Sequence, residues 1–424
     1  MHLPAKHVDL HAVVELMRKL STLTDPQEAA ILYGSGLRRF KLVPNDRYLS
    51  LSRRGLKYPQ FRITRNSDWK QHPDPWNEKH RLPLLSGGLL AEIIYSNEPA
   101  IIKDLPSRVS REDPASDVLQ GMKLLVSLPH YDNGESINAG ILLNREDDFP
   151  FEDLPMMLWQ ANLWGRATLN LVTQQKLQQA YFAIDRELKV VADIQRSLLP
   201  RELPRIKNTQ VAAHYRTSQR AGGDYYDFFP LPGDQWGIFL ADVSGHGTPA
   251  AVLMAVTHAI AHTHPGDPQP PEATLAYINK VLGRLYTHDN GTFVTAFYGI
   301  YDPHRRILQY ASAGHPPARH LRCGKVLGVD GETSLPLGID TEETFLRHQL
   351  ELAPGDQLLL YTDGVPDTFN ADGDAFSIDR LDAACAAICD APDALVARIL
   401  QELADFSGSA APTDDQTLIA FHFD

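Results

Sequence analysis

Residues 238–255 read IFLADVSGHGTPAAVLMA and combine an apolar run, a carboxylate and two glycines in one short segment. The apolar run predicts a buried strand that closes with Asp242 and Val243. Gly245 and Gly247 permit a sharp turn, and a helix is expected directly after it. Asp242 is therefore expected at a strand end where the backbone can approach a ligand closely.

Aspartates recur at the ends of other apolar strands in the same region. Asp224 stands in AGGDYYDFF, Asp363 follows LLLYT, and Asp414 with Asp415 precedes TLIAF. A single aspartate at a strand end is usually a turn residue, but the recurrence favours a shared site. If these strand ends converge, the carboxylates repel one another strongly unless cations lie between them. Oxygen ligands of this kind suit Mg²⁺ or Mn²⁺ rather than zinc.

The region from about residue 203 onward alternates further strands and helices. Strands are expected at Trp236–Val243, Phe293–Tyr301, Arg306–Ser312, Gln357–Tyr361 and Thr417–Phe421. Helices are expected at 248–262, 272–287, 379–389 and 392–405.

Several motifs in this region stand in a fixed order. They are DIQRSLLPRELP, GGDYYDFF, LADVSGHGTPAAVLMA, TFVTAFYGIYDPHRRILQYASAGHPP, LPLGI, PGDQLLLYTDGV and DDQTLIAF. In these motifs the chain resembles the SpoIIE/RsbU branch of the PPM-type (type 2C) metal-dependent serine/threonine phosphatases. The resemblance implies an α/β/β/α sandwich over residues 200–424. It departs from the family after YTDGV, where the family's later FG pair is replaced by Phe376 and Ser377.

The resemblance also implies roles for the aspartates around two Mn²⁺ or Mg²⁺ ions. Asp242 is expected to bridge both ions, with the backbone carbonyl of Val243 on one of them. Asp224 would serve the same ions directly or through water, and Asp363 and Asp414 would complete the second. Asp242 and Asp224 are thus the expected catalytic residues, and the nucleophile would be a metal-bridging hydroxide that attacks phosphorus in line.

Four neighbouring residues are expected to support this site. Asp415 is expected to hold the site together rather than bind an ion, and Gly223 and Gly245 to shape the loops beside it. His246 has two interpretations: it protonates the leaving serine oxygen, or it caps the next helix or bonds a carbonyl. The structural interpretation is favoured.

Other polar residues carry weaker signals. His258 and His262 have a spacing that can hold zinc on a helix, but the sequence offers no evident third ligand, so ordinary helix histidines are favoured. His315 in AGHPP is expected to close a turn. Arg220 is interpreted as an exposed arginine rather than a phosphate contact.

Residues 8–172 form a region of different character. Helices are expected near 8–20 and 25–38, and strands near 48–52 and 61–64, while Asp132-Asn133-Gly134 predicts a hairpin turn. With GGLLAEIIYSNEPAIIKDL, GILLN and a closing FEDLPMMLWQAN helix, the region resembles a GAF domain. This implies a sensory α/β domain around an antiparallel sheet that receives a small-molecule or protein signal. The alternative is a scaffold that only mediates dimerisation.

Residues 173–199 connect the two regions as a predicted helix that Pro200 ends. Apolar residues recur there at spacings of four and three, as in a coiled coil, with Gln195 as one polar intrusion. The pattern favours a parallel two-stranded coil, hence a homodimer, over a helix packed on its own neighbour. The apolar positions are Leu177, Tyr181, Ile184, Leu188, Val191 and Leu198.

Composition limits the other classes of function. The 424 residues carry 53 acidic and 40 basic side chains, for a formal charge of −13, so nucleic acid is an unfavourable main partner. No apolar run approaches 18 residues and the start of the chain lacks a signal-peptide pattern, so no membrane span is expected and a cytoplasmic location is predicted.

Together these features predict an α+β protein: a GAF-like domain, a helical coiled-coil linker and a sandwich phosphatase domain. The predicted reaction is hydrolysis of phosphoserine or phosphothreonine on a regulatory partner, by family analogy a STAS-type anti-anti-sigma protein. The alternative is a catalytically silent partner-switching module with a phosphatase fold. A nucleotide cyclase is disfavoured, because GGDYYDFF shares only Gly-Gly-Asp with the GGDEF motif of those enzymes.

Overall fold

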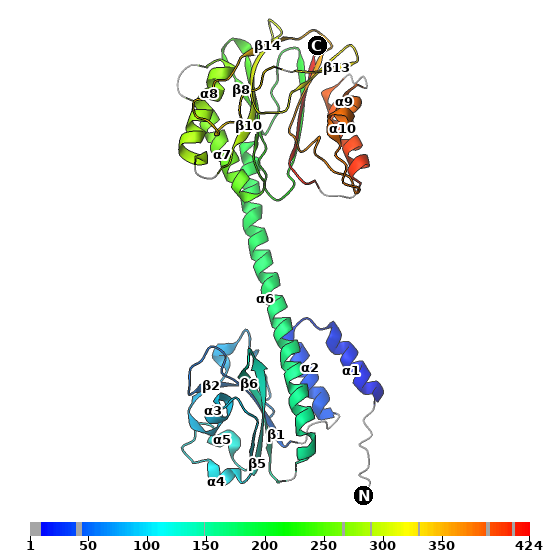
Figure 1. Ribbon diagram of the computed structural model, residues 1–424. Helices are drawn as coiled ribbons and strands as arrows, with labels where there is room; N and C mark the ends of the chain where they lie inside the picture. The colour runs from blue at the N-terminus through cyan, green and yellow to red at the C-terminus, as the bar shows by residue number, and fades with distance from the viewer. Residues whose placement is uncertain are drawn as a thin grey trace. The chain divides into compact units, whose positions relative to one another are not determined.

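The computed structural model describes residues 10–39, 45–147, 149–264, 268–288, 291–329, 331–386, 391–408 and 412–424 (Figure 1). The chain separates into two compact units, here called the N-terminal unit (Met1–Phe182) and the C-terminal unit (Ala183–Asp424). Within the described ranges, every helix is too short or too polar to cross a bilayer.

The N-terminal unit is built on a six-stranded antiparallel sheet of order β3-β2-β1-β6-β5-β4. Its strands are β1 (Arg47–Ser52), β2 (Gln60–Asn66), β3 (Leu84–Ser86), β4 (Ala100–Ile102), β5 (Leu124–Asp132) and β6 (Glu135–Asn144). Its shorter helices are α1 (Leu10–Thr22), α2 (Pro26–Arg39), α3 (Gly88–Tyr95), α4 (Leu105–Arg108) and α5 (Ser116–Leu119). The helices and strands expected near residues 8–64 are present, with ends shifted by at most two residues; the expected start at residue 8 lies outside the described residues.

The predicted hairpin turn is also present. β5 ends at Asp132, β6 begins at Glu135, and Asn133 and Gly134 between them have φ of 51° and 82°. Such positive φ values are what a two-residue hairpin turn requires.

Helix α6 (Leu154–Leu198) runs for 45 residues and joins the two expected helical segments into one. Its first half belongs to the N-terminal unit and its last turns to the C-terminal unit. It ends directly before Leu199 and Pro200, as the proline requires.

The C-terminal unit contains two five-stranded antiparallel sheets, of order β14-β11-β10-β9-β8 and β13-β12-β15-β16-β7. The first sheet consists of β8 (Tyr225–Pro230), β9 (Trp236–Val243), β10 (Val294–Asp302), β11 (Ile307–Ala313) and β14 (His348–Glu351). The second consists of β7 (Thr209–Arg216), β12 (Arg319–Arg322), β13 (Lys325–Gly328), β15 (Gln357–Tyr361) and β16 (Gln416–Phe423).

Helices cover the outer faces of both sheets (Figure 1). α7 (Thr248–His262) and α8 (Pro271–Leu282) pack on β9, β10 and β11, while α9 (Ser377–Cys385) and α10 (Pro392–Ser407) lie with β7 and β16. Strand β15 is buried on both sides: Leu358 and Leu360 join the core between the sheets, and Leu359 joins the core under α9 and α10. The C-terminal unit is therefore the α/β/β/α sandwich that was expected.

The helix boundaries show two differences from the sequence prediction. The helix expected over 272–287 is α-helical only to Leu282, and a π-helical turn covers Gly283–Thr287. The helix expected over 379–389 is present as α9, which begins at Ser377 and ends at Cys385. The last three residues of the expected range, 387–389, lie outside the described residues.

Candidate metal centre

The aspartate-bearing strand ends meet at one edge of the sandwich. The pairing of Tyr225 with Ala241 places the start of β8 beside the end of β9, next to Asp224 and Asp242. In the second sheet, Tyr361 pairs with Leu418, so the end of β15 lies beside the start of β16. Asp363 follows β15 and Asp414 precedes β16. The antiparallel pairing of these strands therefore brings the two aspartates to the same end of the sheet.

Asp224 links the two sheets. Its Oδ2 accepts hydrogen bonds from Thr362 Oγ1 at 2.8 Å and Thr417 Oγ1 at 2.5 Å, both from the second sheet. The Asp224 side chain is buried, and its Oδ1 has no hydrogen-bond partner among the described residues. A buried oxygen without a partner is costly in free energy, and a cation would satisfy it.

The carboxyl groups are close enough to perturb one another. The pKa of Asp224 is raised to about 8, mainly by burial and also by nearby Asp415 and Asp363, while the hydrogen bonds from Thr417 and Thr362 act to lower it. Burial, with Asp224, Asp363 and Asp414 nearby, raises the pKa of Asp242 to about 10. Burial is also the main cause of the raised pKa values of Asp363 and Asp414. Without cations, the site therefore favours protonated carboxyl groups.

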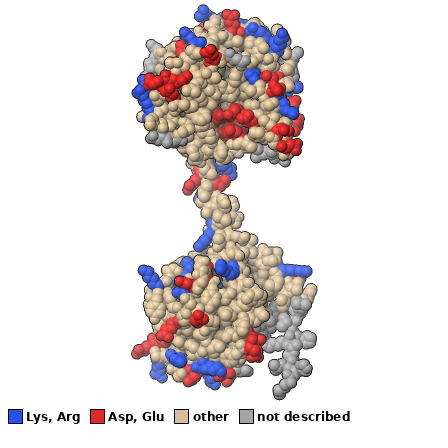
Figure 2. Space-filling view, viewed as in Figure 1, with Lys and Arg blue, Asp and Glu red and all other residues tan. Residues whose placement is uncertain are grey.

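The donor set fits hard divalent cations. Among the described residues, none of these four aspartates forms an ion pair with lysine or arginine, although opposite charge is what such a cluster needs. Carboxylate and carbonyl oxygens without nitrogen or sulfur ligands match Mg²⁺ or Mn²⁺. Figure 2 shows that acidic side chains also gather in a patch on the visible face of the C-terminal unit.

Asp415 has a different environment from the other four aspartates. Its Oδ1 accepts hydrogen bonds from the Ser218 backbone N–H at 2.7 Å and the Ser218 hydroxyl at 3.2 Å, and its Oδ2 accepts one from Gly223 N–H at 2.6 Å. Both of its oxygens are thus occupied by the loop that leads to Asp224. The geometry agrees with a supporting role for Asp415 rather than a ligand role.

Gly223 is required by a close approach of two backbone segments. A Cβ atom at this position would lie 2.7 Å from the carbonyl oxygen of Val243. The Val243 N–H also donates to the Gly223 carbonyl, at 3.4 Å. The loop that carries Asp224 is therefore held against the end of β9, beside the Val243 carbonyl that was expected to bind a cation.

The turn after β9 has the predicted form. Gly245 and Gly247 have φ of 89° and 76°, and α7 begins at Thr248. His246 lies exposed between them, and its Nδ1 is 2.9 Å from Gln219 Nε2. It also lies near enough to Asp414 to lower that residue's pKa slightly.

Three features of the site were not predicted. Thr362 and Thr417 hold Asp224, and Asp367 adds a further negative charge near Asp363 and Asp414. Asp367 follows Asp363 by four residues in the same segment, TDGVPD, and this proximity was the available signal for it. The two threonines gave no signal, because their role depends on the second sheet facing the first.

The polar intrusion in the α6 seam also has a structural reason. Buried Gln195 donates from Nε2 to the Gly222 carbonyl at 2.5 Å, and its Oε1 accepts from the Gly222 N–H at 3.0 Å. The end of α6 is therefore bonded directly to the GGD loop. Arg220 of the same loop is exposed, as predicted, and it also forms a two-point ion pair with Asp185 of α6 at 2.9 and 3.0 Å.

The remaining histidines lie in hydrogen-bonded settings. His315 is buried with Nδ1 2.9 Å from Thr295 Oγ1, and burial lowers its pKa to about 3, so it is neutral. His258 and His262 do have a third potential ligand nearby, Asp227, with His262 Nε2 2.7 Å from Asp227 Oδ2. Tyr225 OH bonds both Asp227 and His258, at 2.7 and 3.1 Å. These hydrogen bonds account for the three side chains without a bound ion.

Comparison with known proteins places this site in a family. Residues 232–424 match the family model described as Stage II sporulation protein E (SpoIIE). The chain is 28% identical to the phosphoserine phosphatase RsbP of Bacillus subtilis over 192 residues, which are 45% of this chain and 47% of RsbP. It is also 28% identical to the phosphoserine phosphatase RsbU of Bacillus subtilis over 211 residues, 50% of this chain and 61% of RsbU. The chain spans less than two thirds of the length of these two relatives.

Structural comparison agrees at the level of the fold. The SiaA-PP2C domain of Pseudomonas aeruginosa is similar with a TM-score of 0.52 and 23% identity, over 58% of this chain and 98% of that domain. The family match includes Asp242, Asp363 and Asp414, whereas Asp224 precedes its start and is tied to them by the hydrogen bonds of its side chain. Residues 232–424 therefore belong to the SpoIIE/RsbU-type family of PPM phosphatases.

Proposed function

We propose that the protein is a metal-dependent phosphatase that hydrolyses phosphoserine or phosphothreonine on a regulatory partner protein. The observation that carries the proposal is the collection of four aspartates at one edge of the sandwich, where burial and neighbouring carboxylates raise their pKa values and where they lack a lysine or arginine partner among the described residues. The similarity to two phosphoserine phosphatases supports the choice of substrate class.

Asp224, Asp242, Asp363, Asp414 and the carbonyl of Val243 would hold two Mg²⁺ or Mn²⁺ ions. Bound there, such ions would neutralise the phosphoryl oxygens and make a water molecule acidic enough to attack phosphorus. The protein's own contribution is to hold these oxygens in place. Thr362 and Thr417 fix the orientation of the Asp224 carboxylate, and Asp415 fixes the loop in front of it.

His246 would contact the substrate, because its exposed side chain lies in the turn directly after β9. The Gln219 amide N–H donates to its Nδ1, so in the neutral ring the proton lies on Nε2. That N–H can donate to a phosphoryl oxygen. The interaction with Gln219 makes this binding role better supported than a role as general acid.

The partner and the regulation are proposed from the resemblance and from α6. The partner would be a small STAS-type regulatory protein, and a small-molecule or protein signal at the GAF-like N-terminal unit would control turnover. Exposed apolar side chains on α6 support a homodimer, because Leu177, Tyr181 and Ile184 are 55%, 66% and 55% exposed in the single chain. A coiled coil would bury them.

The proposal predicts phosphatase activity that depends on Asp242. Purified full-length chain should hydrolyse p-nitrophenyl phosphate and a phosphoserine peptide with Mn²⁺ or Mg²⁺, and EDTA should abolish turnover. Asp242→Asn should reduce kcat/KM by about a thousandfold or more, because the residue is expected to contact both ions.

Asp193→Asn is the matched control, since it makes the same chemical change at an exposed position on α6. It should retain wild-type turnover. Equal activity of Asp242→Asn and Asp193→Asn would contradict the proposed centre. A wild-type chain that binds its partner but never releases phosphate with either metal would favour the binding-module alternative.

A further inference from the structure

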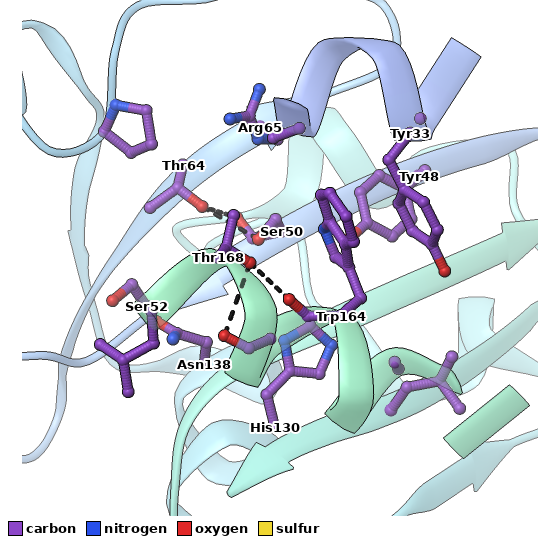
Figure 3. A pocket seen from close by; sticks show the side chains of 18 of the residues that line it. Tyr33, Tyr48, Ser50, Ser52, Thr64, Arg65, His130, Asn138, Trp164 and Thr168 are labelled. Atoms are coloured by element: carbon purple, nitrogen blue, oxygen red, sulfur yellow. Dashed lines mark hydrogen bonds between the residues drawn. The ribbon is translucent and has the colours of Figure 1, made fainter. Parts of the chain in front are cut away.

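A cavity of about 500 Å³ lies within the N-terminal unit, between α2, the first half of α6 and one face of the sheet (Figure 3). A volume of this size accommodates a small organic molecule. The opposite face of the same sheet is filled: Leu49, Leu51, Phe61 and Ile63 pack there against α3. The cavity is therefore separate from the core on that face, and it borders a smaller apolar cluster on its own face through Leu128, Leu142 and Met157.

The sheet face that lines the cavity is unusually polar for a surface covered by helices. Along β1 the cavity side carries Tyr48, Ser50 and Ser52, and along β6 it carries Asn138 followed by Gly140 and Leu142. A face that only packed on helices would carry apolar side chains, because burying polar groups without partners costs free energy. The polar side chains of this face therefore offer hydrogen-bonding groups to a polar ligand between the sheet and the helices.

A β-bulge in β2 directs two consecutive side chains toward this space. Ser50 pairs with Arg65 and Leu51 with Ile63, so Thr64 is the extra residue of the bulge. Thr64 Oγ1 donates to the Ser50 carbonyl at 3.0 Å, and both Thr64 and Arg65 line the cavity. Bulges commonly re-aim side chains in this way beside binding sites.

Arg65 is a largely buried cation without a carboxylate partner. Its guanidinium donates to Gln27 Oε1 at 2.7 Å and lies 5.8 Å from the centre of the Trp76 ring, and no ion pair of Arg65 is found among the described residues. Burial lowers its pKa, and the more distant Asp74, which forms no ion pair with it, only partly opposes this effect. An anion in the cavity would remove the cost of this buried charge.

His130 adds a neutral hydrogen-bonding group. Burial lowers its pKa to about 4, so one ring nitrogen donates and the other accepts near neutral pH. The ring fits between two glycines, since a Cβ on Gly140 would lie 3.7 Å from Nε2 and one on Gly165 would lie 3.4 Å from Nδ1. No hydrogen bond to the ring occurs in the described part of the chain, which leaves both nitrogens for a ligand.

Aromatic rings complete the lining. Tyr33 of α2 stacks on Trp164 of α6 with ring centroids 4.0 Å apart and planes 10° apart. Figure 3 shows Tyr48 next to this pair, with Arg65, Ser50 and His130 around the same space. Flat rings of this kind favour a planar ring system in the ligand.

The charged residues that line the cavity favour an anionic ligand. Among the described residues that line the cavity, seven are lysine or arginine, and Asp132 is the one acid. Asp132 is itself paired with Arg54 at 2.8 Å. This local excess of positive charge contrasts with the formal charge of −13 for the whole chain.

We propose that this cavity binds a small planar aromatic carboxylate, with the carboxylate on Arg65 and the ring among Tyr33, Tyr48 and Trp164. A carboxylate is favoured over a phosphate ester because Arg65 is the buried cation available to neutralise it, and a single guanidinium matches a single negative charge in a two-point contact. The site is independent of phosphatase activity, so binding is measured directly and either proposal can fail without the other.

The test is calorimetric titration of the full chain with 2-naphthoate and with its uncharged counterpart, 2-naphthamide. For 2-naphthoate we expect a dissociation constant on the order of 10–100 µM, and for the amide binding weaker by about tenfold or more. No binding of 2-naphthoate, or equal binding of both compounds, would overturn the proposal. This comparison needs no variant, so it stands even where a substitution impairs folding.

Two arginine variants then locate the carboxylate. Arg65→Gln should weaken 2-naphthoate binding by about tenfold or more and leave the amide unaffected. Arg166→Gln removes the same charge from an exposed residue lining the same cavity, and should change the affinity less than about twofold. Equal losses in the two variants would show attraction by net charge alone and would overturn the assignment to Arg65.

Discussion

Ser377 occupies a backbone position that suits glycine. It has φ of 69°, and its N–H donates to the Pro366 carbonyl at 2.8 Å at the start of α9. The family's FG pair has glycine here, so the departure in the sequence concerns conformation rather than chemistry. Phe376 before it is buried among α9 and α10, as the core requires.

Ser377→Gly is therefore expected to stabilise the C-terminal unit by about 1 kcal/mol, because glycine adopts this backbone conformation without the steric cost of a Cβ atom. Chemical denaturation would measure the change. Ser197→Gly, in the regular helix α6, is the control and should destabilise by about 0.5–1 kcal/mol. A loss of stability in Ser377→Gly would contradict this explanation of the departure.

At the scale of elements, the contact between α6 and the GGD loop offers a route by which the helix influences the site. Gln195 and Asp185 hold Gly222 and Arg220, which lie two and four residues before Asp224. A shift or rotation of α6 would move this loop. The polar residue in the seam thus serves the site rather than the coiled coil.

Gln195→Leu removes both hydrogen bonds to Gly222 and keeps a similar volume. Because Gln195 acts through the position of Asp224, we expect a higher Mn²⁺ concentration for half-maximal activity, by about tenfold, with turnover recovering at saturating metal. Gln178→Leu, at an exposed position of the same helix, should leave the metal dependence unchanged. Loss of turnover that metal cannot restore would instead indicate a purely structural role.

The apolar seam of α6 makes a second prediction at this scale. Tyr181→Glu with Ile184→Glu should shift the chain from dimer to monomer, because like charges would face each other across a coiled coil. Sedimentation equilibrium would measure the mass. Gln174→Glu with Gln178→Glu adds the same charge at polar positions and should leave a dimer. A monomeric wild-type chain would exclude the proposed coil.

At the scale of the whole molecule, the site couples stability to pH. The folded-state pKa values of Asp224 and Asp242, about 8 and about 10, lie above the ordinary value of 3.8. The folded state therefore binds protons more tightly than the unfolded state. The stability that this tighter proton binding gives the folded state is complete below about pH 4, and it is lost as pH rises through the folded-state pKa values.

In EDTA, the Tm of the C-terminal unit should accordingly fall between about pH 6 and about pH 9. Added Mg²⁺ or Mn²⁺ should raise Tm more at the higher pH, where the carboxylates are free to bind it. Differential scanning calorimetry would follow both effects, and Asp242→Asn should reduce the slope. A metal-induced rise in Tm that is larger at the lower pH would have the wrong sign for this site.

Local patterns in the sequence were sufficient to predict many of the helices and strands. The apolar runs of β9 and β15 and the helix after Gly247 have the predicted ends, because burial and glycine act over a few neighbouring residues. The GAF-like identity of the N-terminal unit stays a prediction, since it depends on apolar spacing. The π-helical turn at Gly283–Thr287 was not foreseen, because it depends on packing against Gly338 and Thr341.

The sequence by itself determined which residues are candidates for the site: aspartates at strand ends, in motifs that resemble those of the SpoIIE/RsbU-type phosphatases. Only the tertiary structure decided how they act together. The hydrogen bonds from Thr362 and Thr417 to Asp224, and from Gln195 to Gly222, join residues far apart in the chain. The same holds for the cavity around Arg65, which needs a bulge, a sheet face and two helices at once. Such contacts leave no local pattern, because the two sides of each contact are brought together only by packing.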